Sequence, residues 1–421
     1  MLFSCKKNSV QNNPTDDSTV ITKNVFGGSG LDEFTSAIQT TDDGWIAIGT
    51  TGSNDGDAAG GHGQEDIWVV KFDKSYKIIW QKKFGSSGRD FGLNIVAIQG
   101  GYIITGSVGS NDGDVVGSHG AIDAWVAKIN ESGSILWKKT FGGSGNDGMA
   151  SSLPTNDGGL ILVGNTTSND GDASAIHGVD DAWVLKIDAS GNKIWQRTYG
   201  GNGNDALISL AKANDGGYIA VGTSSSTNGD ISGNHGNSDV WMVKLDETGN
   251  LQWQKCLGGE NEDYGTSVIP AIDGGYLVAS YTNSYAGNVT NLHGYTDGWL
   301  LNVDNSGNIK WQKTFGGKDI DQIYNVIKSV DNNYLTIGYT QSSDIDPANY
   351  KGGFSDAWVL KLSKDGNVLS QKLLGGSDED YGRAVILRKS EYILIGKTFS
   401  NDKDILGFAG YGDAWFMPFK M

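Results

Sequence analysis

Short runs in which apolar and polar residues alternate recur along the whole chain, separated by turns rich in Gly and Asn. In one clear unit the runs are Gly148–Pro154, Leu160–Asn165, Ala182–Ile187 and Lys193–Thr198. Alternation predicts β-strands, and the helical period of about 3.6 residues is absent. Turns such as Asn-Asp-Gly-Gly and Ser-Gly-Asn are typical of hairpins, because Gly and Asn tolerate positive φ. Each unit is therefore expected to form four short antiparallel strands, with a long loop at 166–180.

The third run of the unit is apolar on both sides. Trp183 and Leu185 lie on one face of this strand, and Ala182 and Val184 on the other, because side chains alternate along a strand. A four-stranded sheet that is covered on both faces by sheets of its own kind is a propeller blade.

The same unit is repeated seven times. An Asp-x-Trp triplet recurs every 57 to 59 residues, beginning at Asp66, Asp123, Asp181, Asp239, Asp297, Asp356 and Asp413. A second set of aspartates opens the first strand of each unit: Asp32, Asp90, Asp147, Asp205, Asp263, Asp321 and Asp380. Such a period is typical of stacked units that cannot bury their apolar faces alone.

The last unit lacks a fourth strand, and the segment ahead of the first unit has the missing pattern. This segment, Val20–Phe26, is expected to complete the last blade and to close the ring, which removes two exposed sheet edges. We therefore expect an all-β fold: one seven-bladed β-propeller over residues 18–421, with four antiparallel strands in each blade.

Composition and charge narrow the function classes. The 63 Gly and 5 Pro suit an all-β chain with many tight turns. A formal charge of −17 argues against nucleic acid as a partner, because no basic groove is offered to phosphates. No apolar run approaches the roughly 20 residues that span a bilayer.

The two cysteines have different contexts. Cys256 lies on a fourth strand and is expected to be a small buried residue. The segment Leu2-Phe3-Ser4-Cys5 resembles the end of a bacterial lipoprotein signal, which predicts lipidation of Cys5. Residues 1–17 are then a truncated signal and a lipid-anchored tether, and the chain is an outer-membrane lipoprotein or a secreted protein of the bacterial envelope. The alternative is an accidental Cys in a disordered tail.

The full repeat, from Phe-Gly-Gly-Ser through His-Gly-x-x-Asp-x-Trp to Gly-Asn-x-x-Trp-Gln-Lys, resembles the β-propeller repeats of secreted proteins and lipoproteins of Bacteroidota. The resemblance covers about residues 18–421 and implies the fold and the envelope location. The segment 186–195 is also similar to quinoprotein propeller repeats, which implies a docking role for the fourth-strand tryptophans Trp80, Trp137, Trp195, Trp253 and Trp311. Seven units do not match the eight-bladed quinone-binding ring.

One face of the ring is expected to gather both aspartate sets, the long loops and the histidines that precede Asp-x-Trp: His62, His119, His177, His235 and His293. One interpretation is structural, a hydrogen-bond network of His, Asp and the third-strand Trp, similar to the tetrad of WD repeats. Small polar residues of the first strands complete it: Ser36, Asn94, Ser151, Ser209, Ser267 and Asn325.

Two further interpretations assign chemistry to this face. Clustered oxygens in the Asn-Asp-Gly-Asp loops could chelate Ca²⁺. The candidate ligands are Asp55, Asp57, Asp112, Asp114, Asp170 and Asp172. No other cofactor is expected. A transition-metal or acid–base site at the histidines is the third interpretation, although the ring holds them far apart.

The repeats diverge in units five to seven. Gly352 and Ala409 replace the histidine, and new aromatic residues enter the loops. Rigid aromatic rings beside charged groups are suited to stacking on a sugar or to anchoring a protein. The ligand-binding candidates are Tyr264, Tyr285, Tyr295, Tyr350, Phe354, Tyr381, Phe408, Tyr411 and Arg383. Alternatively, these rings only fill the space that the absent histidines leave.

No catalytic motif is present in the sequence: there is no nucleophile elbow, Cys–His pair or zinc signature. An enzyme is expected to show a unique polar set on the first strands, where Arg383, Lys328 and Lys212 are unusual. We therefore predict a monomeric, non-enzymatic binding module for a glycan or an envelope protein. The alternative is a glycan-active hydrolase or lyase that uses carboxylates on the same face.

Overall fold

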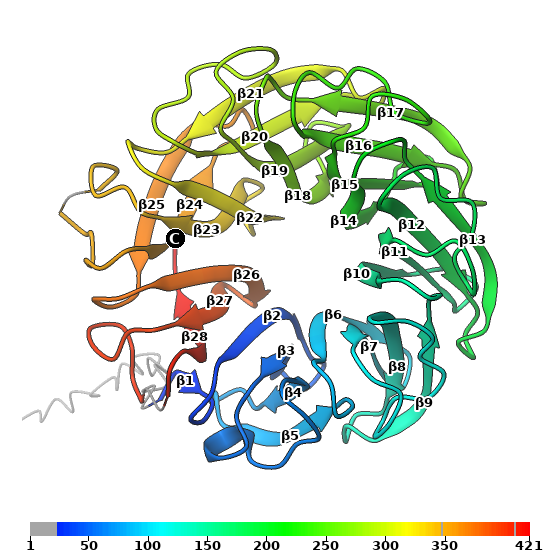
Figure 1. The fold of residues 1–421 in the computed structure, drawn as a ribbon. Helices are drawn as coiled ribbons and strands as arrows, with labels where there is room; N and C mark the ends of the chain where they lie inside the picture. The colour runs from blue at the N-terminus through cyan, green and yellow to red at the C-terminus, as the bar shows by residue number, and fades with distance from the viewer. Residues whose placement is uncertain (1–22, 347, 408–409) are drawn as a thin grey trace, which may run out of the picture.

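The computed structural model describes residues 23–346, 348–407 and 410–421. These residues form seven four-stranded antiparallel sheets arranged around a central channel (Figure 1). Within the described ranges the one helical segment is a short 3₁₀ turn, Gly56–Ala58. The predicted all-β, seven-bladed propeller is confirmed.

In the first six blades the four strands follow one another in chain order from the channel to the rim, and in the last blade the N-terminal strand is the outermost. The innermost strands are β2 (Asp32–Gln39), β6 (Phe91–Ile98), β10 (Asp147–Pro154), β14 (Asp205–Lys212), β18 (Asp263–Pro270), β22 (Asp321–Lys328) and β26 (Asp380–Arg388). The second strands are β3 (Trp45–Thr51), β7 (Gly101–Val108), β11 (Leu160–Thr166), β15 (Tyr218–Ser224), β19 (Tyr276–Thr282), β23 (Tyr334–Thr340) and β27 (Glu391–Thr398). The third strands are β4 (Asp66–Phe72), β8 (Asp123–Ile129), β12 (Asp181–Ile187), β16 (Asp239–Leu245), β20 (Asp297–Val303), β24 (Asp356–Leu362) and β28 (Asp413–Phe419). The outer strands are β5 (Ile78–Phe84), β9 (Ile135–Phe141), β13 (Lys193–Tyr199), β17 (Leu251–Leu257), β21 (Ile309–Phe315), β25 (Val368–Leu374) and, in the last blade, β1 (Val25–Phe26).

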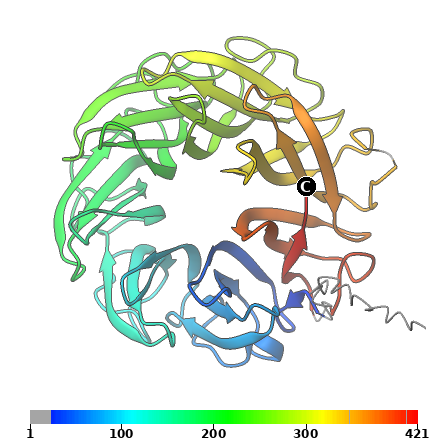
Figure 2. The same ribbon diagram turned by 180° about the vertical axis from the view of Figure 1, so that it is seen from behind.

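The ring is closed by the N-terminal strand, as the sequence predicts. Val25 pairs with Trp415, and Phe26 pairs with Ala414. The side chain of Asn24 strengthens the seam, because its Nδ2 donates to the Asp404 carbonyl at 2.9 Å and its Oδ1 accepts from the Leu406 amide at 2.7 Å. Figure 2 shows β1 in blue beside the red C-terminal strands. The predicted strand was longer, and its first residues, 20–22, lie outside the described residues.

The core consists of seven apolar clusters, each shared by two neighbouring blades. The third-strand tryptophans fill these clusters, and each is at most 3% exposed. Most of these indole N–H groups donate to a Gln on the adjacent outer strand, as Trp299 does to Gln312 at 2.7 Å. Interactions between blades therefore carry most of the apolar burial, which is typical of repeat architectures.

A second set of tryptophans locks each of the first five blades to the next. Trp195 on β13 lies close to the hairpin turn between the third and outer strands of the following blade, here called the C–D turn. A Cβ added to Gly249 in this turn would come within 2.3 Å of its ring. Equivalent contacts are made by Trp80, Trp137, Trp253 and Trp311. The docking role implied by the quinoprotein resemblance is therefore present.

In the first blade this contact between blades runs in the opposite direction. Its C–D turn has Tyr76 where the other turns have Gly, with a φ of 65°. Thr22, which lies outside the described residues, occupies the place of the docking Trp in the sequence. Instead, the Tyr76 ring packs back onto the last blade, stacked on Phe416 at 5.2 Å between centroids.

Every innermost strand has a β-bulge at the same place, three residues after its opening Asp. A bulge leaves one residue outside the ladder and redirects side chains. The bulged residues form a ring around the channel: Thr35, Leu93, Ala150, Ile208, Thr266, Tyr324 and Arg383. In blades six and seven the bulged residues have large side chains, those of Tyr324 and Arg383.

Candidate ligand-binding site

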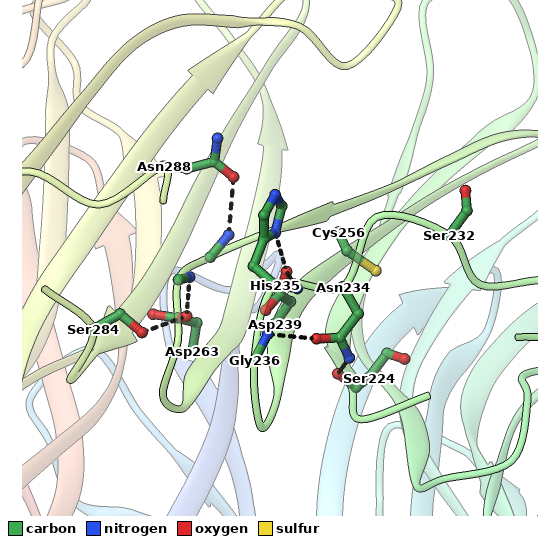
Figure 3. Close-up of polar contacts among 12 residues, drawn as sticks. Ser224, Ser232, Asn234, His235, Gly236, Asp239, Cys256, Asp263, Ser284 and Asn288 are labelled. Carbon is green, nitrogen blue, oxygen red and sulfur yellow. Dashed lines mark hydrogen bonds and ion pairs between the residues drawn. The ribbon is translucent and has the colours of Figure 1, made fainter. Parts of the chain in front are cut away.

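The histidines on the loop face pair with the Asp of Asp-x-Trp. In the fourth blade His235 Nδ1 lies 2.6 Å from an oxygen of Asp239, and the backbone amide of His235 donates to the same carboxylate (Figure 3). The predicted tetrad is therefore correct in its His–Asp part. It is wrong for the Trp, because Trp241 donates to Gln254 at 3.1 Å. Gln254 is a diagonal neighbour of Trp241 on the adjacent strand.

The aspartates that open the innermost strands are buried, and each acts as a clip that holds two loops of its blade together. Asp263 Oδ2 accepts from the Gly259 amide at 2.8 Å and from the Ser284 hydroxyl at 2.9 Å (Figure 3). The clip holds the loop entering the blade against the loop between its second and third strands. All fourteen repeated aspartates of the two sets are buried. Their charge is therefore not presented to a ligand.

The candidate Ca²⁺ ligands have donors of their own. The first Asp of each loop accepts a backbone N–H, as Asp55 does from Ser29 at 2.7 Å. The second Asp pairs with an ammonium group, as Asp172 does with Lys193 at 2.6 Å. Within the described ranges no three His, Cys, Asp or Glu residues are grouped so that they could hold a metal ion. The Ca²⁺ site stays a prediction that the geometry does not favour.

Asp356, in a blade without the histidine, is expected to make stability fall as pH rises. Burial, and to a smaller extent the nearby Asp380, raise the pKa of this carboxyl to about 7. The folded state therefore favours the protonated form. This stabilisation is complete below the ordinary pKa of 3.8 and is lost as pH rises to about 7.

Thermal unfolding at pH 5 and pH 8 tests this expectation. Asp356→Asn should be more stable than the native chain at pH 8 and should show a smaller difference between the two pH values. Asp365→Asn, which removes an exposed carboxylate of the same blade, is the control and should leave the difference unchanged. Parallel pH curves for Asp356→Asn and the native chain would contradict the assignment.

The predicted aromatic residues do not form one patch. Tyr285, Tyr295, Phe354 and Tyr411 are 66–76% exposed; the first two lie on one loop of the fifth blade, and the others on loops of the sixth and seventh. Tyr350 is half-buried, and its hydroxyl donates to the Gly353 carbonyl of its own loop at 3.0 Å. Phe408 lies outside the described residues. Three positions are structurally matched, each two residues before its Asp-x-Trp on consecutive blades: Tyr295, Phe354 and Tyr411.

The structure instead brings five tyrosines together at the channel, in blades five to seven. We name the set the tyrosine arc: Tyr264, Tyr281, Tyr324, Tyr339 and Tyr381. Consecutive ring centroids in this order are 5.1, 6.4, 5.8 and 5.0 Å apart. These separations are those of favourable aromatic pairs. The arc is therefore a continuous aromatic wall.

Two cations of the last blade lie against this wall. The Arg383 guanidinium carbon is 5.0 Å from the Tyr324 centroid and 5.9 Å from that of Tyr381. Lys397 Nζ is 5.5 Å from the Tyr381 centroid. Arg383 also reaches across the seam to Glu33 of the first blade, with 3.5 Å between Nη2 and Oε2. Of the predicted site residues, Tyr264, Tyr381 and Arg383 therefore meet.

The arc borders a cavity of about 580 Å³ at the loop-face end of the channel. This volume lies within the usual range of ligand pockets, about 300–1,000 Å³. Glu33 and Arg383 are the charged residues among those that line it, and Ile208 forms part of the opposite, apolar wall. The cavity is thus aromatic and polar on one side and aliphatic on the other.

Burial shapes the chemistry of these groups. It raises the pKa of Tyr381 to about 12, and the hydrogen bond from its hydroxyl to Glu379 raises it too. Burial also raises the pKa of Tyr281 and Tyr339. At neutral pH the tyrosines therefore remain protonated, suited to stacking and to donating hydrogen bonds. Burial lowers the pKa of Lys397.

Other predicted positions have simpler roles or cannot be placed. Cys256 is 5% exposed, as expected of a small core residue. Lys212 and Lys328 end their innermost strands and therefore lie at the opposite end of the channel from the cavity. Cys5 lies outside the described residues. No described helix is long and apolar enough to cross a bilayer.

Sequence reasoning missed Tyr281, Tyr324 and Tyr339, although a signal for them existed. Along the second strands, the residue before the last reads Thr50, Ser107, Asn165, Thr223, Tyr281, Tyr339 and Lys397 in chain order. The side chains at the last three of these positions are large, and those at the first four are small. A comparison of strand positions, rather than of loops, would have located the site.

Comparison with known proteins gives distant likenesses. A family described as outer membrane protein assembly factor BamB matches residues 65–238, less than half of the chain. The regulatory protein FlaEY of Caulobacter vibrioides is 26% identical over 230 residues, which are 50% of this chain and 24% of that protein. The chain thus spans about a quarter of the length of this relative.

Several solved structures share the propeller fold. Puromycin hydrolase has 10% identity and a TM-score of 0.50, covering 90% of this chain and 54% of that one. An ancestral GH74 enzyme has 11% identity and a TM-score of 0.51, covering 93% and 48%. BamB from Moraxella catarrhalis has 12% identity and a TM-score of 0.39, covering 91% and 85%. The repeat match over residues 65–238 indicates a distant likeness to propeller repeats of the BamB type, and the structures with TM-scores of 0.50 and 0.51 agree with the propeller fold.

Proposed function

We propose that this protein is a non-enzymatic binding module of the bacterial cell envelope that holds a glycan in the channel cavity. The observation that carries the proposal is the tyrosine arc, which breaks the sevenfold repeat at one side of the cavity. Repetition in every blade is what folding needs, whereas a cluster confined to three blades is not required by the fold. Aromatic faces beside carboxylate and guanidinium groups suit the apolar faces and hydroxyls of a sugar.

The envelope location and the lipid anchor at Cys5 are part of the proposal. They are supported by the lipoprotein-like segment 2–5 and by the likeness of residues 65–238 to a family described as an outer membrane assembly factor. The chain is proposed to act as a monomer, attached to the membrane through lipid alone.

Tyr324→Ala is expected to weaken glycan binding about 30-fold, because the loss of an aromatic anchor costs about 2 kcal/mol. Tyr324 holds the bulge position and contacts both Tyr281 and Arg383. Binding of the purified full chain to a glycan array identifies the ligand, and titration calorimetry measures the loss.

Two further variants interpret this result. Tyr324→Phe retains the ring and should retain most of the affinity. Tyr285→Ala removes an exposed ring on a loop and should have no effect. A chain that binds no glycan, or a Tyr324→Ala variant with unchanged affinity, would remove the cavity from consideration.

A second candidate function is protein docking, which the three matched loop aromatics favour. Tyr295, Phe354 and Tyr411 are 72%, 72% and 76% exposed, and exposed aromatic residues are typical of protein hot spots. The hydrolase or lyase alternative is less well supported, because Glu33 is the one carboxylate among the described residues lining the cavity. Two-carboxylate hydrolysis needs a pair of such groups. Release of shorter products from a bound glycan would favour the enzyme.

A further inference from the structure

Two cations of the last blade lie at this site: Arg383 lines the cavity, and Lys397 lies over the ring of Tyr381 in the tyrosine arc. At the bulge position the other six blades have Thr, Leu, Ala, Ile, Thr and Tyr, and only the seventh has Arg383. At the residue before the last of each second strand, only the seventh blade has a cation, Lys397. One blade therefore presents two positive charges to a channel end where the other six blades present none at these positions.

These cations are incompletely paired. Arg383 Nε is buried and lacks a hydrogen-bond partner among the described residues. Its contact with Glu33, at 3.5 Å, is long and uses Nη2 alone. No ion pair within 4.0 Å joins Lys397 to a described carboxylate, and its Nζ lies over the rings of Tyr381 and Phe399. A buried donor without a partner in a native protein requires an explanation, and an unbound ligand is one.

We propose that the bound glycan is acidic, with a carboxylate on its sugar units, and that Arg383 and Lys397 recognise this carboxylate while the tyrosine arc stacks on the ring. This inference rests on the proposed function and names the class of its ligand. The planar guanidinium forms paired hydrogen bonds with a carboxylate. An anion between the two cations also relieves their mutual repulsion.

The nearby acids argue for a singly charged group. Glu33 contacts Arg383, and Glu379 accepts from the Tyr381 hydroxyl at 2.7 Å. These two carboxylates balance the charge of the two cations. They would therefore repel a doubly charged phosphate about twice as strongly as a singly charged carboxylate. The mouth of the channel therefore selects a carboxylate over a more highly charged anion.

The test compares matched pairs of oligosaccharides by titration calorimetry with the full chain. Each pair consists of a uronic-acid oligosaccharide and the same molecule with its carboxyl groups reduced to alcohols, and a neutral oligosaccharide that carries a phosphate monoester, with a charge of about −1.5 to −2, is the third probe. The acidic member of at least one pair should bind about tenfold more tightly than its reduced partner. Arg383→Gln and Lys397→Met should each reduce the ratio of the affinity for the acidic member to the affinity for its reduced partner.

The variants are controlled for folding and for charge. Arg383→Lys preserves the charge but not the fork of donors, so it should keep only part of the preference. Lys212→Gln removes a charge at the opposite end of the channel and should change nothing. Circular dichroism and thermal unfolding confirm that each variant is folded.

The outcomes separate the two proposals. Equal binding of acidic and reduced members overturns the acidic-ligand inference and leaves the glycan proposal standing. A preference that survives both cation variants, or equal binding of the phosphorylated probe, also overturns it. Failure of every oligosaccharide, acidic and neutral, to bind overturns the proposed function itself.

Discussion

Deletion of residues 1–26 is expected to lower the free energy of unfolding by about 3–6 kcal/mol. Val25 and Phe26 are 0% and 5% exposed, and full burial of each such side chain contributes about 1.5–3 kcal/mol. Phe26 also stacks on Phe416 of the last blade, with 5.6 Å between centroids. Without β1, strand β28 is left with an unpaired edge.

Urea unfolding measured by tryptophan fluorescence tests this expectation. The matched control lacks residues 1–22 only, so the two variants differ in Lys23, Asn24, Val25 and Phe26. The difference between their unfolding free energies is the contribution of the closing strand. Equal midpoints would show that the ring is held by the other blade interfaces without it.

Gly249→Ala is expected to destabilise the fold by about 2–5 kcal/mol, the second largest effect. The residue has a φ of +82°, and its added Cβ would lie 2.3 Å from Trp195. The left-handed backbone costs an alanine about 1–2 kcal/mol, and overpacking against the indole costs about 1–3 kcal/mol more. The turn would therefore have to move away from the preceding blade.

Gly233 offers a matched control on the same blade. Its φ is +83°, and nothing lies within 4 Å of an added Cβ. Gly233→Ala therefore has only the backbone cost. The excess destabilisation of Gly249→Ala measures the lock and should disappear in a Trp195→Ala background, as in a double-mutant cycle. Equal losses for the two alanine variants would exclude a lock at this turn.

Most of the fold could be predicted because it follows from features that repeat along the sequence. The Asp-x-Trp triplets fixed the number of blades, and hairpin turns such as 188–192 fixed the strands between them. The closing strand was recognisable because Val25 and Phe26 continue the pattern that the last unit lacks. Each of these features depends on local chemistry, which a sequence displays directly.

The site was predicted only in part, because the bulges are not visible in the sequence. A bulge places Tyr324 in the channel, out of the ladder in which Ile323 and Asn325 remain. Simple alternation does not anticipate such a residue. The binding role of Tyr285 stays a prediction, because the neighbours of an aromatic residue in a loop are not evident from the sequence. Equivalent residues of the innermost strands lie close together around the channel axis, whereas residues of the loops lie farther apart toward the rim.

The reversed contact of Tyr76 makes the first and last blades unlike the interior ones. Blades two to five each receive one indole and offer one, so a duplicated or lost copy among them would still find a compatible neighbour on both sides. The first and last blades meet through a different contact, that of Tyr76 with Phe416. Gene duplication could therefore change the number of copies among blades two to four, while blades five to seven, which contain the tyrosine arc, stay unchanged.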